Sequence, residues 1–285
     1  MDTLFLRLSL RRIAAGALSL AVLGSAPATA AGPGDWSAKL LPAPAFPDAP
    51  AKPPGRGAKM PLEVVSSQAN EIIDEDAWFT RNRLPHPERD LQTLPESIPR
   101  QFRDASLLRA FEGGDRLFLV FGKDFGEQRY LMAVDPQTYA FQYGFDFQRW
   151  AHPPDEIGEY TGQRVIWAVE KGGILYVSHG HNSYARESKG KNAYVTAIDP
   201  KTEEILWRSP ALVANARTFL VLDDALLTGY GFTAEPDFLY LLDRKTGEIR
   251  GRQPLKTGPD FILRQGDRIF VRCYDMDEVF RLRTP

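Results

Sequence analysis

From residue 106 onward, short apolar runs alternate with tight polar turns along the chain. Four of these runs follow an acidic or glycine turn, and each is closely preceded by another apolar run. The four runs are 116–121, 174–177, 225–228 and 268–271, and the runs before them are 106–109, 165–168, 218–221 and 261–264. Apolar runs of this length, bounded by turn residues, are typical of β-strands, so each pair predicts a hairpin.

Three of the four units continue with a second hairpin that carries a shared turn sequence. Its order is an apolar residue, any residue, Asp, two further residues and Thr, and the three copies begin at residues 133, 197 and 241. An Asp side chain accepts a hydrogen bond from its own backbone two residues on, while proline fixes φ and glycine supplies a positive φ. We therefore interpret Asp135, Asp199 and Asp243 as turn residues rather than catalytic carboxylates.

Repetition of one antiparallel module predicts an all-β fold. We expect a small β-propeller-like array of about four four-stranded antiparallel blades over residues 106–285. The fourth unit ends at 279–282, one strand short of a full blade. A strand at 62–66 would complete it and join both parts of the chain in one sheet; without such a strand the array is open and needs a partner at its edge.

The segment 197–207 resembles the repeat of the pyrroloquinoline-quinone-type β-propellers, Ala-x-Asp-x-x-Thr-Gly-x-x-x-Trp. It departs from that repeat only at Glu203, which replaces the glycine, and the more degenerate copy at 133–143 ends in Tyr143 instead of tryptophan. In the family, the tryptophan packs between neighbouring sheets. The resemblance therefore implies that Trp207 and Tyr143 are structural residues between blades.

The resemblance implies a fold more than an activity. Quinoprotein dehydrogenases of this family have many more blades, and many carry paired cysteines at the cofactor, whereas this chain has the single Cys273. The same repeat also builds non-catalytic propellers of the bacterial envelope, including an outer-membrane assembly factor. We therefore expect no cofactor, and in particular no pyrroloquinoline quinone, and we expect a binding or scaffolding role.

The first thirty residues have the layout of a secretory signal peptide. Three arginines precede the apolar run 13–23, and the block closes with the small residues 28–30. This order predicts Sec-type export, cleavage after Ala30 and a periplasmic or secreted protein. No apolar run reaches the roughly 18 to 20 residues that a membrane helix requires, so we expect no transmembrane anchor.

Charge and composition divide the rest of the chain. Removal of residues 1–30 leaves 32 basic and 36 acidic side chains, so nucleic acid is not an expected partner. Residues 31–61 are rich in proline and lack apolar periodicity, which predicts a flexible tether. Residues 62–105 are polar and irregular apart from the strand at 62–66, and we expect them to wrap the main domain.

Propellers expose two sets of connections on one face: the loops between the second and third strands of each blade, and the links between blades. Loops on a rigid scaffold are where binding residues concentrate. The ligand-binding candidates are therefore the polar and aromatic residues of these connections, namely Lys123, Asp124, Trp150, His152, His179, His181, Asn182, Tyr184, Arg186, Tyr230 and Asp275. The leading hypothesis is that this face binds an envelope or extracellular protein, peptide or glycan.

Three histidines provide an alternative. His179 and His181 are separated by one residue, so their side chains point to the same side of an extended segment. Together with His152 they would serve a metal-dependent hydrolase or lyase, but a divalent metal needs three or four ligands within about 2.0 to 2.2 Å, which spacing does not establish. Ordinary loop histidines are the simpler interpretation, a quinoprotein dehydrogenase is the third alternative, and no catalytic residue is assigned.

Overall fold

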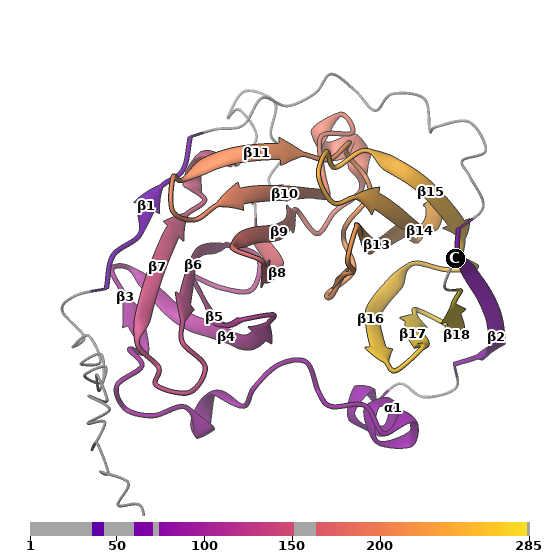
Figure 1. Ribbon diagram of the computed structural model, residues 1–285, viewed down its shortest axis with the longest axis horizontal. Helices are drawn as coiled ribbons and strands as arrows, with labels where there is room; N and C mark the ends of the chain where they lie inside the picture. Colours follow the sequence, from indigo (N-terminus) through magenta and orange to yellow (C-terminus); the bar gives the residue numbers. More distant parts are fainter. Residues whose placement is uncertain (1–35, 43–59, 71–73, 151–163, 284–285) are drawn as a thin grey trace, which may run out of the picture.

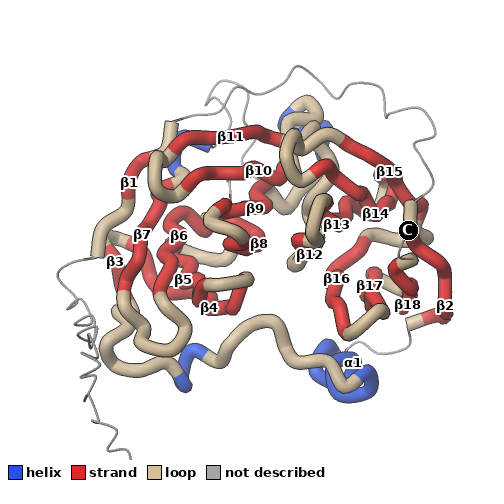
Figure 2. The backbone as a smooth tube through the Cα atoms, in the orientation of Figure 1, coloured by secondary structure: helices blue, strands red, loops and turns tan. Residues whose placement is uncertain are grey.

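The computed structural model describes residues 36–42, 60–70, 74–150 and 164–283, and most of them lie in β-strands. Figure 1 shows four sheets placed side by side around a common centre, which confirms the predicted all-β, propeller-like fold. Figure 2 shows that helical turns are confined to the connections and the N-terminal part. Those described are α1 (Glu75–Asn82), η1 (Leu91–Thr93), η2 (Gln148–Trp150) and η4 (Ala185–Ser188). None of the described helices is long and apolar enough to cross a membrane.

The first sheet has more strands than the predicted blade. Its spatial order is β1 (Lys39–Leu40), β7 (Phe141–Asp146), β6 (Gln128–Val134), β5 (Arg116–Gly122), β4 (Ala105–Gly113) and β3 (Gln101–Phe102). The four central strands form the expected antiparallel meander. The two-residue strands β3 and β1 are additions at its edges, and β1 pairs in parallel with β7.

Residues 36–42 lie within the segment predicted to be a flexible tether, yet they pack on the first sheet. Trp36 and Leu41 are buried, and the carbonyl oxygen of Pro42 accepts a hydrogen bond of 3.1 Å from Nε1 of Trp150. The tether prediction is therefore wrong for these residues. The prediction rested on the average composition of the segment and gave no weight to Trp36 and Leu41. Burial of these two large apolar side chains offsets the entropy lost when so short a segment is ordered.

The second and third sheets each consist of four antiparallel strands in chain order. The second contains β8 (Arg164–Lys171), β9 (Ile174–Gly180), β10 (Tyr194–Asp199) and β11 (Glu204–Arg208). The third contains β12 (Leu220–Val221), β13 (Ala225–Phe232), β14 (Glu235–Asp243) and β15 (Ile249–Pro254). One apolar core cluster extends across the first three sheets, and within it Phe111 stacks on Trp167 with ring centroids 3.9 Å apart.

The fourth sheet takes its outer strand from the N-terminal part of the chain. Its order is β16 (Pro259–Gln265), β17 (Arg268–Cys273), β18 (Met276–Leu282) and β2 (Leu62–Ala69). β2 runs antiparallel to β18 over its whole length, from Leu62 opposite Leu282 to Ala69 opposite Met276. The segment 62–66 considered in the sequence analysis lies in this strand, so the fourth sheet has the same number of strands as the second and third.

The segment that follows β2 crosses from the fourth sheet to the first (Figure 1). In α1, Trp78 is buried and stacks on Phe261 of β16, with ring centroids 6.3 Å apart. Further along, Glu88 forms a β-bridge with Phe111 of β4. These contacts link the last sheet to the first through the N-terminal segment.

Aromatic residues at equivalent repeat positions join neighbouring sheets. Nε1 of Trp207 in the second sheet donates a hydrogen bond of 3.1 Å to the carbonyl oxygen of Arg244 in the third. The hydroxyl of Tyr143 in the first sheet donates one of 2.5 Å to the carboxylate of Glu170 in the second. Burial raises the pKa of Tyr143, and the bond to Glu170 raises it further. These contacts match the inter-blade role that the resemblance implied for both aromatic residues.

The repeat aspartates act in turns, as predicted. Asp135, Asp199 and Asp243 each accept hydrogen bonds of 2.7–3.3 Å from the backbone N–H groups two and three residues on. The fourth residue after each aspartate is left-handed, with φ of 58° at Tyr139, 65° at Glu203 and 73° at Gly247. Glycine adopts this conformation at no steric cost, which explains its place in the family repeat.

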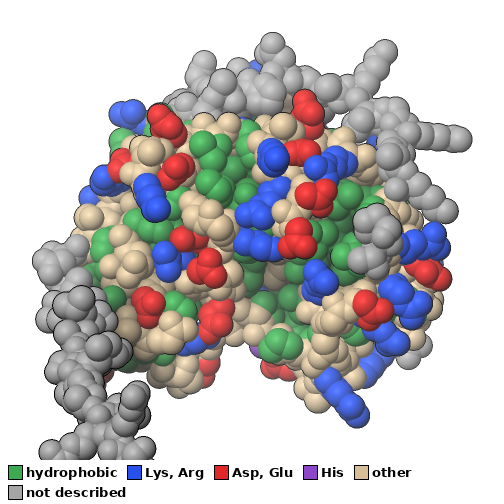
Figure 3. Space-filling model, in the orientation of Figure 1, with side chains coloured by type: hydrophobic (Ala, Val, Ile, Leu, Met, Phe, Trp, Pro, Cys, Tyr) green, Lys and Arg blue, Asp and Glu red, His purple; other side chains and the backbone are tan. Residues whose placement is uncertain are grey.

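Basic and acidic side chains are interspersed over the surface seen in Figure 3. Some form exposed ion pairs, such as Arg250 with Asp224 and Asp243. Exposed pairs contribute about 0 to 1 kcal/mol each. The stability of the fold therefore depends mainly on the apolar contacts within and between the sheets.

Candidate functional site

The connections between the second and third strands of the sheets meet one another and the links between sheets. Tyr184 of the β9–β10 connection packs on Phe232 at the end of β13, with ring centroids 4.6 Å apart. The backbone N–H of Tyr274 in the β17–β18 turn donates to the carbonyl of Gly258 in the link between the third and fourth sheets, at 3.0 Å. We call this surface the loop face, formed by residues 123–127, 181–193, 233–234 and 274–275.

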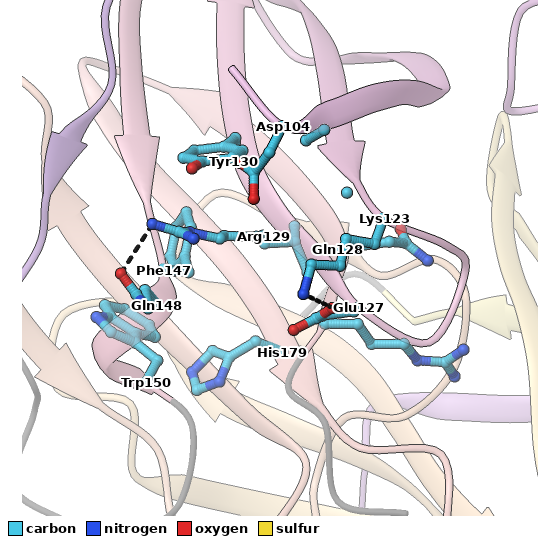
Figure 4. Close-up of a pocket in the computed structure, with 14 residues that line it drawn as sticks. Asp104, Lys123, Glu127, Gln128, Arg129, Tyr130, Phe147, Gln148, Trp150 and His179 are labelled. Atoms are coloured by element: carbon cyan, nitrogen blue, oxygen red, sulfur yellow. Dashed lines mark hydrogen bonds and ion pairs between the residues drawn. The ribbon is translucent and has the colours of Figure 1, made fainter. Parts of the chain in front are cut away.

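A pocket of about 350 Å³ lies between the first and second sheets at the loop face (Figure 4). Its walls come from the turn before β4, the ends of the β5–β6 connection, the residues after β7, and strands β8 and β9. The charged and aromatic groups that define it include Lys123, Arg129, Tyr130, Trp150, Arg164 and His179. A volume of this size is at the lower end of the range for small-molecule sites.

Three of the residues predicted from the sequence line this pocket. Lys123 is exposed and forms an ion pair of 3.4 Å with Glu127. Trp150 and His179 are buried, and their rings meet edge to face at 4.6 Å. Nε2 of His179 lies 3.1 Å from the hydroxyl of Thr196. Trp150 and His179 are thus parts of the wall, and Lys123 is at the mouth.

Six other predicted residues lie on or beside the loop face but outside the pocket walls. Three of them make local hydrogen bonds: Asp124 within the β5–β6 connection, Tyr230 of β13 with Glu235 of β14, and Asp275 with Thr257. The other three belong to the β9–β10 connection and are exposed or half-buried, namely Asn182, Tyr184 and Arg186. The structure therefore does not bring these six residues together in the pocket.

The histidines proposed for a metal have separate surroundings. Nε2 of His181 lies 2.7 Å from the hydroxyl of Ser188, whereas His179 contacts Trp150 and Thr196. His152 lies outside the described residues. Within the part of the chain that the structure describes, no group of three or more His, Cys, Asp or Glu side chains is placed to hold a metal ion.

Arg164, the first residue of β8, is one of the charged pocket residues that were not predicted from the sequence. Its Nε atom is buried and has no hydrogen-bond partner among the described residues. Burial, together with repulsion from Arg109 and Arg217, lowers the pKa of Arg164 to about 10, while the carboxylate of Asp260 acts in the opposite direction. The surroundings of Arg164 thus disfavour the charged form of its guanidinium.

The neighbouring arginines, in contrast, have carboxylate partners. Arg109 pairs with Glu88 at 2.7 Å, and Arg217 pairs with Glu75 at 2.5 Å. Both carboxylates come from the N-terminal segment that crosses between the fourth and first sheets. That segment therefore neutralises two of the three cations and leaves Arg164 to the pocket.

Several pocket residues lie at strand ends beside the connections, outside the positions predicted from the sequence. Arg164 opens β8, and Gln128, Arg129 and Tyr130 open β6, so all four lie in strands that border the pocket. A usable signal was present, because Arg164 directly precedes a predicted apolar strand. Charged residues at strand ends next to a ligand-bearing face belong among the candidates.

Comparison with known proteins gives no family. No family model matches the chain, and no curated protein matches it. Among solved structures, the chain is similar to the computationally designed Ika4 protein, with 10% identity over 67% of this chain and 99% of that one and a TM-score of 0.42. It is also similar to BamB from Moraxella catarrhalis (12% identity, 66% and 74% covered, TM-score 0.30) and to a quinohemoprotein alcohol dehydrogenase from Pseudomonas putida (11%, 64% and 39%, 0.35). The resemblance to the quinone-type repeat stays a prediction from the sequence.

Proposed function

We propose that this chain is an exported, non-catalytic propeller-like protein that binds a protein, peptide or glycan of the envelope or extracellular space through its loop face. The observation that carries the proposal is the exposure of two aromatic side chains on that face. Phe125 is 62% exposed and Tyr274 is 89% exposed. Aromatic side chains are enriched at the centres of protein interfaces, where their burial supplies much of the binding energy.

The position of these aromatics favours the loop face over other surfaces. Phe125 belongs to the β5–β6 connection and Tyr274 to the β17–β18 turn, so a partner that covers both contacts the first and fourth sheets. The other large exposed hydrophobic residues among those described are aliphatic and lie on edge strands, namely Leu40, Val64, Val65 and Leu206. Single exposed aliphatic residues are common on soluble proteins and indicate no site.

A binding role is also supported by the state of the histidines. His179 and His181 are buried, and each has its own hydroxyl partner. Residues arranged in this way stabilise the wall of the pocket and the β9–β10 connection. Export is proposed from the signal-peptide layout of the first thirty residues.

Site-specific photo-crosslinking in the host tests this function. With the crosslinker at position 125 or 274, we expect one defined adduct, and with the crosslinker at position 245, an exposed site in a turn beside a repeat aspartate, we expect none. After identification and purification of the adduct partner, the variant with Phe125→Ala and Tyr274→Ala should bind it at least tenfold more weakly, because each lost aromatic anchor costs about 1 to 2 kcal/mol or more.

Two outcomes would contradict the proposed function. Equal adducts at positions 125, 274 and 245 would mean that the loop face is not the binding surface. We expect this chain to be recovered from the envelope or medium with its N-terminus at Ala31. Its recovery from the cytoplasm with the first thirty residues intact would contradict export.

A further inference from the structure

The pocket between the first and second sheets contains one cation, Arg164, whose buried Nε atom has no hydrogen-bond partner among the described residues. Lys123 is paired with Glu127, and Arg129 donates two hydrogen bonds of 2.8 and 2.7 Å to the carboxylate of Asp146. The Nε atom of Arg164, in contrast, is buried and makes no hydrogen bond to a described residue, and the carboxylate whose charge favours this cation is that of Asp260. A guanidinium carries five N–H donors in a planar fork, so this leaves a strong, directed donor group at the pocket wall.

An unpaired cation in such a position is costly for the protein alone. Desolvation of a charge that lacks a partner is unfavourable by several kcal/mol, and an anion that accepts hydrogen bonds from it offsets that cost. Arg109 and Arg217 add repulsion, since both disfavour the charged form of Arg164. Binding sites retain unfavourable groups of this kind when the ligand completes them.

The other groups of the pocket restrict the anion. Asp104 also lines it, and its carboxylate would repel a doubly charged ligand such as phosphate more strongly than a singly charged one. Tyr130, Phe147 and Trp150 supply an aromatic wall. The combination suits a single carboxylate attached to an apolar or aromatic group, because a carboxylate matches the guanidinium fork in two parallel hydrogen bonds.

We propose that this pocket binds a monocarboxylate whose charged end is held by Arg164 and whose apolar part lies against Tyr130, Phe147 and Trp150. A free small acid and the C-terminal residue of a peptide both present this chemistry. The proposal concerns the pocket alone, and it holds whether or not Phe125 and Tyr274 bind a larger partner.

Isothermal titration calorimetry of the mature chain, residues 31–285, tests the proposal at pH 7. The probes are phenylacetate as a free acid, N-acetyl-L-phenylalanine as a mimic of a chain terminus, and N-acetyl-L-phenylalaninamide as its uncharged counterpart. We expect saturable binding of at least one acid, binding of the amide at least tenfold weaker, and weaker binding of inorganic phosphate than of the acid. The tighter of the two acids identifies the source of the carboxylate.

Two variants of equal charge change make the test specific. Arg164→Gln should weaken binding of the acid by roughly tenfold to a hundredfold, the loss expected when a hydrogen bond to a charged group is removed. Arg264→Gln changes an exposed residue of β16 that lies outside the pocket, so this variant should bind the acid as the unmodified chain does. Without ligand, Arg164→Gln should melt at the same temperature as the unmodified chain or higher, because it removes an unpaired charge.

Several results would overturn the proposal. They are the absence of saturable binding of either acid, equal binding of acid and amide, tighter binding of phosphate than of the acids, or full retention of acid binding by Arg164→Gln. A lower melting temperature of ligand-free Arg164→Gln would also overturn it, since Arg164 would then be satisfied within the protein itself. None of these results depends on crosslinking at positions 125 and 274, so the two functional proposals fail separately.

Discussion

Gly247→Ala is expected to lower the free energy of unfolding by about 3 kcal/mol, as measured by urea denaturation. Gly247 has a φ of 73°, where a side chain costs about 1 to 2 kcal/mol. A methyl group here would also lie 2.4 Å from Cε3 of Trp207 in the second sheet. Overpacking of this kind typically costs a further 1 to 3 kcal/mol. The effect is large because Trp207 of the second sheet packs directly on the turn of the third sheet that contains Gly247.

A second glycine separates the cost of the left-handed backbone from the cost of the clash with Trp207. Gly173 has a φ of 76°, and no atom of the described residues lies within 4 Å of where its methyl group would be. Gly173→Ala should therefore show only the backbone cost of about 1 to 2 kcal/mol. In a Trp207→Ala background, Gly247→Ala should lose its excess over Gly173→Ala, since the clash is gone. Equal costs at both glycines in the unmodified chain would mean that Trp207 does not pack on this turn.

Trp78→Ala is expected to lower the free energy of unfolding by about 3 to 5 kcal/mol, the range for loss of a large buried aromatic side chain. Trp78 is 1% exposed and stacks on Phe261 of the fourth sheet. The guanidinium carbon of Arg272 lies 5.8 Å from its ring centroid. The substitution opens a cavity under α1 and weakens the contact between the N-terminal segment and the fourth sheet.

Thr80→Ala is the matched control, because Thr80 is an exposed residue of the same short helix. A change within about 0.5 kcal/mol is expected there, as for other surface substitutions. Both variants are compared by urea denaturation under the same conditions. If Trp78→Ala were as mild as Thr80→Ala, the packing of α1 on the fourth sheet would be refuted.

The sequence allowed the repeated module to be predicted because local physics determines it. Alternation of short apolar runs with turn residues predicted the hairpins, and the turn chemistry of Asp135, Asp199 and Asp243 needs only neighbouring backbone groups. The role of Trp207 was accessible through the resemblance. Contacts within one hairpin, or repeated at a fixed place in each unit, leave a readable pattern.

Contacts between distant segments left no such pattern. Composition alone made residues 36–42 a tether, although Trp36 and Leu41 find buried places on the first sheet. His179 was grouped with loop residues, but it lies at the end of β9 beneath Trp150. The charge of Arg164 becomes informative only when Glu88 and Glu75 are seen to pair with its neighbours instead. These features depend on distances between sheets that no single stretch of sequence records.

Hydrogen–deuterium exchange of the mature chain, read from overlapping peptides, tests most directly the claim that the N-terminal strand completes the fourth sheet. β2 pairs with β18 from Leu62 to Ala69, so its paired amides should exchange as slowly as those of Met276–Leu282, and both peptides should open together when the protein is destabilised. Rapid, unprotected exchange of residues 62–69 while 276–282 stays protected would contradict the account.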